Sequence, residues 1–211
     1  MIRYDGISLS FGSDKLFNDF SLEIKKGEKV VLAGKSGIGK SSLLYLILGF
    51  LRPRNGRVLF EGKPVNEHTI WDIRRKIAFI DQDMSIGDHT VLEWFDFVGN
   101  LKANQAMDFS RETIKKLMDL FELGSGLLGK NISDLSGGER QRVAIIVCAL
   151  LKRDVFLLDE ATSALDRSLK ARVVDFFTAQ NRWTVLSISH DTEWLDNPSV
   201  KIYNMEARSW K

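Results

Sequence analysis

The stretch from Gly34 to Ser42 combines glycines with one lysine and hydroxyl side chains, at a spacing that can bind phosphate. Glycines let the backbone turn tightly and bring its N–H groups against phosphate oxygens, and a helix that begins here points the positive end of its dipole at the same anion. In this pattern Lys40 reaches the β- and γ-phosphates of a nucleoside triphosphate, and the Ser41 hydroxyl coordinates Mg²⁺. The apolar strand expected before the motif and the apolar helix after it argue against a chance match. The expected phosphate-binding residues are Gly34, Lys35, Ser36, Gly37, Ile38, Gly39, Lys40, Ser41 and Ser42.

A pair of carboxylates, Asp159 and Glu160, closes the apolar run Val155–Leu158. In an open parallel α/β sheet, ligand-binding groups gather at the carboxyl ends of the strands. Asp159 is therefore expected to hold Mg²⁺ or its water shell opposite Ser41. Glu160 is expected to reach toward the γ-phosphate and polarise an attacking water. Taken alone, the two carboxylates fit a solvent-exposed strand end equally well, and the glycine-rich motif favours the catalytic interpretation.

A second glycine-containing helix start lies at Leu135–Gln141, with the sequence LSGGERQ. Ser136 is a suitable N-cap, and Glu139 three residues later completes a capping box. Two consecutive glycines weaken a helix start, so Gly137 and Gly138 make more sense if a ligand approaches the backbone closely. The pattern predicts a second anion-binding helix end in the same chain.

With these motifs, essentially the whole chain resembles the ABC (ATP-binding cassette) ATPase family, and LSGGERQ resembles its signature motif. Further elements of the family follow in order and at suitable spacing. Gln82 resembles the Q-loop glutamine that contacts Mg²⁺ and water, and His190 resembles the switch histidine that contacts the γ-phosphate. Phe11 lies where the family places an aromatic that stacks on adenine. Ser163, Ala164, Leu165 and Asp166 resemble the D-loop.

The resemblance implies an ATPase that works as a head-to-tail homodimer held together by ATP. Each ATP then lies between the glycine-rich loop of one copy and the signature residues of the other, which are Leu135, Ser136, Gly137, Gly138, Glu139 and Gln141. ATP binds the closed dimer better than the open one and so shifts that equilibrium. The resemblance further implies an integral-membrane permease subunit as partner, with the transported substrate bound by the permease.

Composition sets limits on location and partners. The 211 residues carry a formal net charge of +2 and no long Lys/Arg block, so no nucleic-acid partner is expected. The single Cys148 excludes an internal disulfide framework, and it lies in an apolar run as a core thiol would. The longest apolar runs are about half of what a membrane-spanning helix needs, and the N-terminus lacks the apolar region of a signal peptide. The chain is therefore expected in the cytoplasm, on the inner face of the membrane through its permease.

Strands that alternate with helices predict a P-loop α/β fold with a mainly parallel sheet. The early alternating runs add an N-terminal antiparallel β-layer, and a change to helical periodicity indicates an inserted α-helical subdomain. We expect one domain over 1–211, with a core at 1–83 and 135–211 and the helical subdomain at 84–134. The expected strands are Ile2–Phe11 (interrupted at Asp5-Gly6), Phe20–Ile24, Lys29–Ala33, Arg57–Glu61, Ile77–Ile80, Val155–Leu158, Thr184–Ile188 and Val200–Tyr203, and the expected helices are Lys40–Phe50, Gly137–Leu151 and Ser168–Ala179, with helical periodicity from Thr90 to Glu122.

Several assignments stay open at this level. Trp94, Phe95, Phe97 and Val98 are expected mostly to pack in a core, while some of them could line a groove for a cytoplasmic helix of the permease, beside the Q-loop at about Gln82–Trp94. A soluble ABC ATPase of the iron–sulfur-assembly type is the alternative within the family, and a nucleoside kinase is an alternative outside it that leaves LSGGERQ unexplained. A small two-component system is favoured, with metal or iron exporters as an example. His68 and His89 are expected at the surface, and the three histidines show no metal-ligand spacing.

Overall fold

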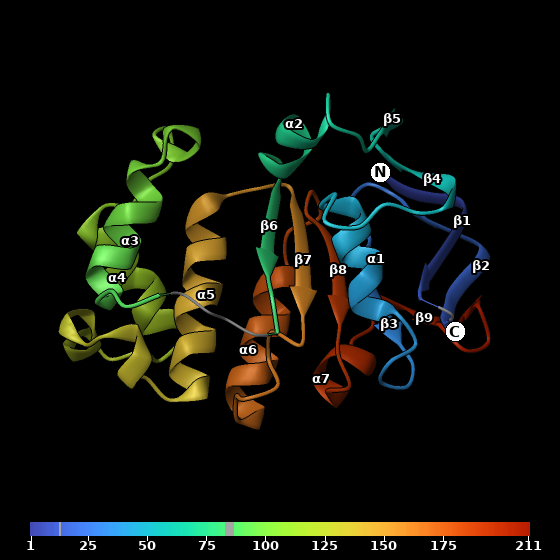
Figure 1. The fold of residues 1–211 in the computed structure, drawn as a ribbon. Coiled ribbons are helices and arrows are strands. Elements are labelled where there is room, and N and C mark those ends of the chain that lie inside the picture. The colour runs from blue at the N-terminus through green and yellow to red at the C-terminus, as the bar shows by residue number, and fades with distance from the viewer. Residues whose placement is uncertain (13, 83–86) are drawn as a thin grey trace.

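A six-stranded sheet forms the centre of the computed structural model, which describes residues 1–12, 14–82 and 87–211 (Figure 1). Its order is β10-β9-β3-β8-β7-β6, and all neighbouring pairs are parallel except β10 with β9. Three of the four inner strands, β3, β8 and β7, are mostly apolar and buried, as expected for parallel strands covered on both faces. The strands are β3 (Lys29–Ala33), β6 (Ile77–Ile80), β7 (Val155–Asp159), β8 (Thr184–Ile188), β9 (Val200–Asn204) and β10 (Ser209–Trp210).

Two hydrophobic cores lie on the two faces of this sheet. On one face, α1 and the N-terminal strands cover Val30, Leu32 and Leu157. On the other face, α5, α6 and the helical segment cover Val31, Phe156 and Leu158. Successive side chains of a strand point to opposite faces, so this division follows from the alternation along β3 and β7. The helices beside the sheet are α1 (Lys40–Ile47), α2 (Ile70–Arg74), α5 (Gly137–Leu151), α6 (Arg167–Thr178) and α7 (Thr192–Leu195).

An antiparallel sheet of four strands, in the order β2-β1-β4-β5, makes the N-terminal layer. Its strands are β1 (Ile2–Phe11), β2 (Asp14–Ile24), β4 (Asn55–Phe60) and β5 (Lys63–Pro64). The expected interruption at Asp5-Gly6 is a shift of register between Tyr4 and Ile7 inside a continuous β1, with Gly6 at a φ of 60°. Asp5-Gly6 therefore forms a β-bulge and not a turn, and β1 continues beyond it.

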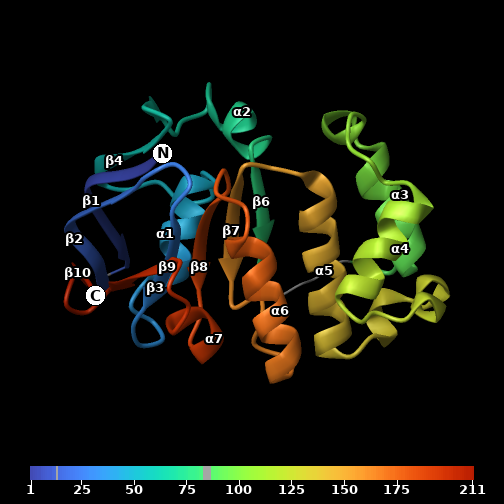
Figure 2. The same ribbon diagram turned by 180° about the vertical axis from the view of Figure 1, so that it is seen from behind.

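The helical segment lies at the end of the molecule far from the N-terminal layer, beside α5 (Figures 1 and 2). It contains α3 (Val91–Asn100), α4 (Arg111–Leu120) and the short 3-10 turns η1 (Lys102–Asn104), η2 (Ser125–Gly129) and η3 (Ile132–Asp134). A capping box between Thr90 and Glu93 fixes the start of α3. Phe95 is fully buried in the same core as α5. The segment thus packs onto the sheet domain, while the boundary predicted at 83/84 falls outside the described residues.

The predicted fold class is confirmed: a mainly parallel sheet, an antiparallel N-terminal layer and inserted helices are all present. The helix predicted over Lys40–Phe50 ends earlier, at Ile47, because Gly49 adopts a φ of 68°. Among the described residues, no helix is long and apolar enough to cross a lipid bilayer.

Candidate nucleotide-binding site

The loop between β3 and α1 carries the glycine-rich motif, at the edge of the sheet toward which β6, β7 and β8 point (Figure 1). Gly39 precedes α1 with a φ of 101°, and a Cβ there would meet Phe17 at 2.6 Å and Leu16 at 2.8 Å. Only glycine fits this position. No side chain of the described residues caps α1, so the positive end of the helix is left for an external anion.

Lys40 is held inside this loop and is only 7% exposed. Its Nζ donates hydrogen bonds to the carbonyl oxygens of Gly34, at 2.7 Å, and Lys35, at 2.9 Å. Burial lowers the pKa of Lys40, while the charges of Glu160, Asp159 and Glu206 act in the opposite direction. The loop thus presents a desolvated ammonium group, which interacts more strongly with a phosphate than a solvated one does.

A cavity of about 420 Å³ opens in front of the loop. Phe11 lines this cavity, is 51% exposed and comes from a segment far in sequence from the phosphate-binding loop. An exposed aromatic ring at this position can stack on adenine. Leu16, from β2, also lines it and was missed by the sequence analysis, because an isolated leucine in an alternating strand carries no signal of a ligand. The lining residues are Phe11, Leu16, Ser36, Gly37, Gly39, Lys40, Ser41, Ser42, Gln82, Glu160 and Ile188.

Asp159 ends β7 beneath this cavity and is 1% exposed. Neither of its carboxylate oxygens has a hydrogen-bond partner among the described residues. Burial raises the pKa of Asp159, whereas the nearby Ser41 hydroxyl and the Lys40 charge lower it. A buried carboxylate without a partner is costly, and a hydroxyl and carboxylate oxygens are the ligands that Mg²⁺ prefers. The donor set therefore fits a magnesium ion.

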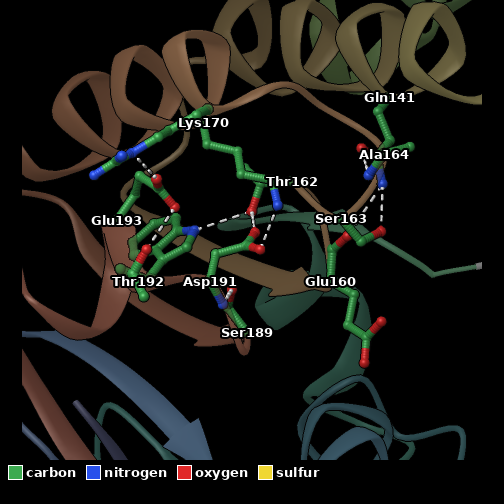
Figure 3. A network of polar contacts seen from close by, with 12 residues as sticks. Gln141, Glu160, Thr162, Ser163, Ala164, Lys170, Ser189, Asp191, Thr192 and Glu193 are labelled. Atoms are coloured by element: carbon green, nitrogen blue, oxygen red, sulfur yellow. Dashed lines mark hydrogen bonds and ion pairs between the residues drawn. The ribbon is translucent and has the colours of Figure 1, made fainter.

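Glu160, the next residue, points its side chain into the same cavity. Its backbone has a φ of 47°, which is uncommon for a residue with a side chain, and its N–H donates to the carbonyl oxygen of Ile188 at 2.9 Å. This anchored left-handed turn redirects the chain at the end of β7. Figure 3 shows the Glu160 carboxylate extending away from Gln141 and Ser163.

The signature segment lies outside this cavity. Ser136 is exposed and caps α5 through the predicted capping box, with Glu139 N–H to Ser136 Oγ at 3.2 Å and Ser136 N–H to Glu139 Oε2 at 2.8 Å. Leu135 is buried in the core. A Cβ on Gly138 would lie 2.8 Å from the carbonyl oxygen of Ala164, so a close approach of the chain's own backbone is a physical reason for this glycine. Gly137 is exposed, and a Cβ there would lie at an ordinary 3.7 Å from the Ala164 Cβ.

Gln141 is 5% exposed, and its side chain connects α5 to the segment after β7 (Figure 3). Its Nε2 donates to the Glu160 carbonyl oxygen at 3.1 Å and to Ser163 Oγ at 2.9 Å, and its Oε1 accepts from the Ala164 N–H at 2.9 Å. The predicted contact of Gln141 with the ATP of a second copy stays a prediction, while within the chain this amide is fully engaged. Of the other D-loop residues, Leu165 is in the core and Asp166 caps α6.

His190 is exposed and lines a separate hollow with residues of α6 and α7. The residue after it, Asp191, is held by Lys170 at 2.5 Å and by the Thr162 hydroxyl at 2.7 Å. The Trp194 indole N–H donates to the same hydroxyl at 3.2 Å, which completes a network linking α6, α7 and the end of β7 (Figure 3). The structure therefore fixes the backbone next to His190, although His190 does not line the glycine-loop cavity.

Comparison with known families decides the identity of this arrangement. The family model described as ABC transporter matches residues 17–163, which include the glycine-rich motif, the signature segment and the Asp159–Glu160 pair. The chain belongs to the ABC transporter family. Its members are ATPases coupled to transport, and this chain is accordingly an ATP-binding and ATP-hydrolysing subunit of that type.

Two relatives of similar size show the range of the family around this ABC transporter chain. It is 35% identical over 180 residues to the thiamine import ATP-binding protein ThiQ of Shigella flexneri serotype 5b, covering 82% of this chain and 75% of the relative. It is 29% identical over 205 residues to the probable iron export ATP-binding protein FetA of Escherichia coli K12, covering 93% and 88%. Both names describe transporter subunits, so neither the iron–sulfur-assembly alternative nor a kinase is favoured.

Solved structures agree on the fold of this ABC cassette. A dimeric bacterial ABC transporter cassette superposes with a TM-score of 0.81 at 24% identity, covering 97% of this chain and 95% of that one. An Atm1-family ABC exporter with ATP bound superposes with a TM-score of 0.82 at 24% identity, covering 96% and 36%. These two similarities each cover at least 96% of this chain.

Proposed function

We propose that two copies of this chain close around two ATP molecules, each held between the glycine-rich loop of one copy and the Ser136 helix end of the other. The observation that carries the proposal is the separation of two helix N-termini: α1 faces the cavity, whereas Ser136 and Gly137 are exposed elsewhere on the surface. A helix start with exposed N–H groups attracts anions, so a second copy can present this end to the γ-phosphate.

Different residues of the cavity bind the adenine, the phosphates and the Mg²⁺ of ATP. Phe11 stacks on the adenine, and Lys40 with the N–H groups of the loop neutralises the β- and γ-phosphates. Ser41, Asp159 and Gln82 hold Mg²⁺, which when bound supplies positive charge at the phosphate oxygens. These roles rest on the shared cavity and on the unpartnered carboxylate of Asp159.

Hydrolysis needs a water oriented on the γ-phosphorus opposite the leaving ADP. Glu160 accepts a hydrogen bond from that water and takes its proton as the oxygen bonds to phosphorus and the bond to the ADP oxygen breaks. His190 contacts the γ-phosphate once the two copies close, and its position is set through Asp191. The products, ADP and phosphate, no longer bridge the two copies, so the pair reopens.

The closing and reopening of the two copies drives conformational change in an integral-membrane permease. The supporting surface is the outward side of α3, where Phe97 is 53% exposed and stacks on Trp94 with ring centroids 5.5 Å apart. Part of the stretch from Gln82 to Trp94 lies outside the described residues, so α3 carries the argument. The named relatives include an importer subunit and a probable exporter subunit, and the proposal assigns direction and cargo to the permease.

The decisive experiment compares the wild type with Glu160→Gln in ATPase and size-exclusion assays with Mg-ATP. We expect the variant to bind ATP, to lose turnover by at least about a hundredfold and to accumulate as an ATP-bound dimer, because binding is intact while the proton acceptor is gone. Lys40→Ala is the matched control and should lose ATP binding and remain monomeric. Normal turnover in Glu160→Gln, or a dimer that forms without nucleotide, would contradict the proposal.

A further inference from the structure

A second aspartate, Asp81, lies next to Asp159 at the same edge of the sheet. Strands β6 and β7 are parallel and in register, with Ile80 opposite Leu158. The residue that follows each of these two is an aspartate, Asp81 directly after the end of β6 and Asp159 as the last residue of β7. Neighbouring strands lie about 4.8 Å apart, and residues at the same level on parallel strands point to the same face. The register therefore brings two carboxylates side by side on the face that α1 covers.

Helix α1 contacts both aspartates with residues one turn apart. Ser41 lies close to Asp159, and the Tyr45 hydroxyl donates to Asp81 Oδ1 at 3.1 Å. Residues four apart lie on the same side of a helix, so Ser41 and Tyr45 face the sheet together. The Gln82 N–H donates to the same Asp81 oxygen at 2.9 Å. Two donors thus orient the Asp81 carboxylate beneath the first turns of the phosphate-binding helix.

The second observation is the state of Asp159, which is 1% exposed with both oxygens unpartnered among the described residues. The negative charges of Asp81 and Glu160 lie close enough to act on it. A buried carboxylate beside a second carboxylate is unfavourable unless a cation offsets the repulsion. Only one ammonium, that of Lys40, acts on Asp159 from the described residues.

We propose that Asp81 is an additional acidic residue of the divalent-cation site, holding a water ligand of the ion that Ser41 and Asp159 bind directly. The proposal rests on the ATP and Mg²⁺ site described above and adds to it a residue that the motifs do not contain. Mg²⁺ in proteins keeps several of its waters and is bound through one or two carboxylates, so a second carboxylate one strand away suits its coordination. A residue that orients metal-bound water changes metal affinity by roughly ten- to a hundredfold.

The competing explanation is that Asp81 only anchors α1 through Tyr45. Two variants separate charge from anchoring. Asp81→Asn removes the negative charge and keeps an oxygen that can accept from the Tyr45 hydroxyl. Tyr45→Phe removes that hydroxyl and keeps the charge. Asp88→Asn, at an exposed position seven residues on, is the control for a neutralised aspartate elsewhere on the chain.

The test measures how strongly Mn²⁺, as a probe for Mg²⁺, tightens binding of a non-hydrolysable ATP analogue to the full chain. For each variant the dissociation constant is determined by calorimetry in EDTA and in saturating Mn²⁺, and the ratio of the two gives the coupling. We expect Asp81→Asn to lower this ratio about tenfold relative to wild type. Tyr45→Phe and Asp88→Asn should keep it within about threefold, and binding in EDTA should not weaken in Asp81→Asn.

Any other result contradicts either the role of Asp81 or the cation site itself. An unchanged ratio in Asp81→Asn refutes the role of Asp81 while leaving the nucleotide site intact. The same loss in Tyr45→Phe assigns the effect to anchoring and also refutes the proposal. A wild-type chain with no Mn²⁺ dependence contradicts the cation site of the proposed function itself. Asp81→Ser, checked with Asp81→Asn by circular dichroism for folding, is the second neutral variant on which the same result is required.

Discussion

The side-chain amide of Gln141 donates a hydrogen bond to the backbone carbonyl oxygen of Glu160, 3.1 Å away. The same amide group is bonded to Ser163 and Ala164. One buried side chain therefore ties the helix after the signature segment to the proposed catalytic glutamate and to the D-loop. This connection gives a physical path by which contacts at the Ser136 helix end can act on the Glu160 backbone.

We expect Gln141→Ala to lower ATP turnover by about tenfold with little change in the ATP dissociation constant. The substitution removes the acceptor of the Ala164 N–H and one of the two hydrogen bonds to the Glu160 carbonyl oxygen, which still accepts from the Ser163 N–H. A lost hydrogen bond of this kind costs about 0.5–1.5 kcal/mol. Steady-state kinetics and nucleotide binding measure the two effects separately. Gln105→Ala, at an exposed glutamine, is the matched control. A parallel loss of ATP affinity would assign Gln141 to nucleotide binding instead.

A second prediction concerns the ion pair between Lys170 and Asp191, whose side chains are 18% and 16% exposed. Lys170→Met leaves the Asp191 carboxylate with the Thr162 hydroxyl and removes its cation. Because breaking a largely buried pair leaves a charge unpaired, the turn that carries His190 loses its fixed position. We expect turnover to fall at least fivefold, with the Michaelis constant for ATP changed less than twofold.

Arg167→Met provides the control for this ion pair, because Arg167 pairs with Glu193 at 3.3 Å but is 92% exposed. Exposed pairs contribute little, so its kinetics and stability should match the wild type. Lys170→Arg should restore most of the turnover. If Lys170→Met lowers only the thermal midpoint while turnover per folded molecule is unchanged, the network is purely structural.

Much of the site could be predicted from the sequence because its parts are local. The glycine-rich motif, the capping box at Ser136 and the buried strands before Gly34 and Asp159 each occupy consecutive residues, and the structure has them at the predicted places. The roles assigned to their side chains remain predictions. Local patterns of this kind depend on backbone conformation and burial, which the residue types of a short segment largely determine.

The remaining features depend on contacts between distant segments. The pairing of Gln141 with Ala164 and that of Asp81 with Tyr45 cross many residues, and no spacing rule indicates them. Helices α2 and α7 and strands β5 and β10 are five residues or shorter, too short to show a hydrophobic period. From the sequence, only the approach of a ligand accounts for Gly138, whereas the structure adds the close approach of the Ala164 carbonyl oxygen.

A third prediction separates packing from docking on α3. Phe95 is fully buried in the core and Phe97 is 53% exposed. Phe95→Ala should lower the free energy of unfolding by about 3–5 kcal/mol. Phe97→Ala should lower it by less than about 1 kcal/mol. Urea denaturation followed by circular dichroism measures both.

Phe97→Ala and Trp94→Ala also test whether α3 forms the surface that binds the permease. Phe97→Ala should keep ATP affinity while weakening co-purification with the permease, and Trp94→Ala, whose ring also packs on the core, should show that loss together with some loss of stability. Intact assembly with the permease in both variants would show that α3 is not the docking surface.

The last prediction concerns Cys148, the single cysteine, which is buried in α5. Burial raises the pKa of its thiol from the ordinary value of 9.0 to about 12. The thiolate is the reactive form, so an aromatic disulfide reagent at pH 8 should modify Cys148 only in the fraction of molecules that is unfolded at equilibrium. ATP with Mg²⁺ should slow the modification, because a ligand that binds the folded state lowers the unfolded population.

The raised pKa of Cys148 also sets the sign of a pH effect. Between pH 9 and about 12 the folded chain keeps a proton that the unfolded chain releases, so the thiol contributes stability below pH 9 that is lost as pH rises through this window. The difference in free energy of unfolding between wild type and Cys148→Ala should therefore shrink from pH 8 to pH 11. A difference that stays constant with pH, or rapid modification of the folded chain, would show that this thiol is not sealed in the core.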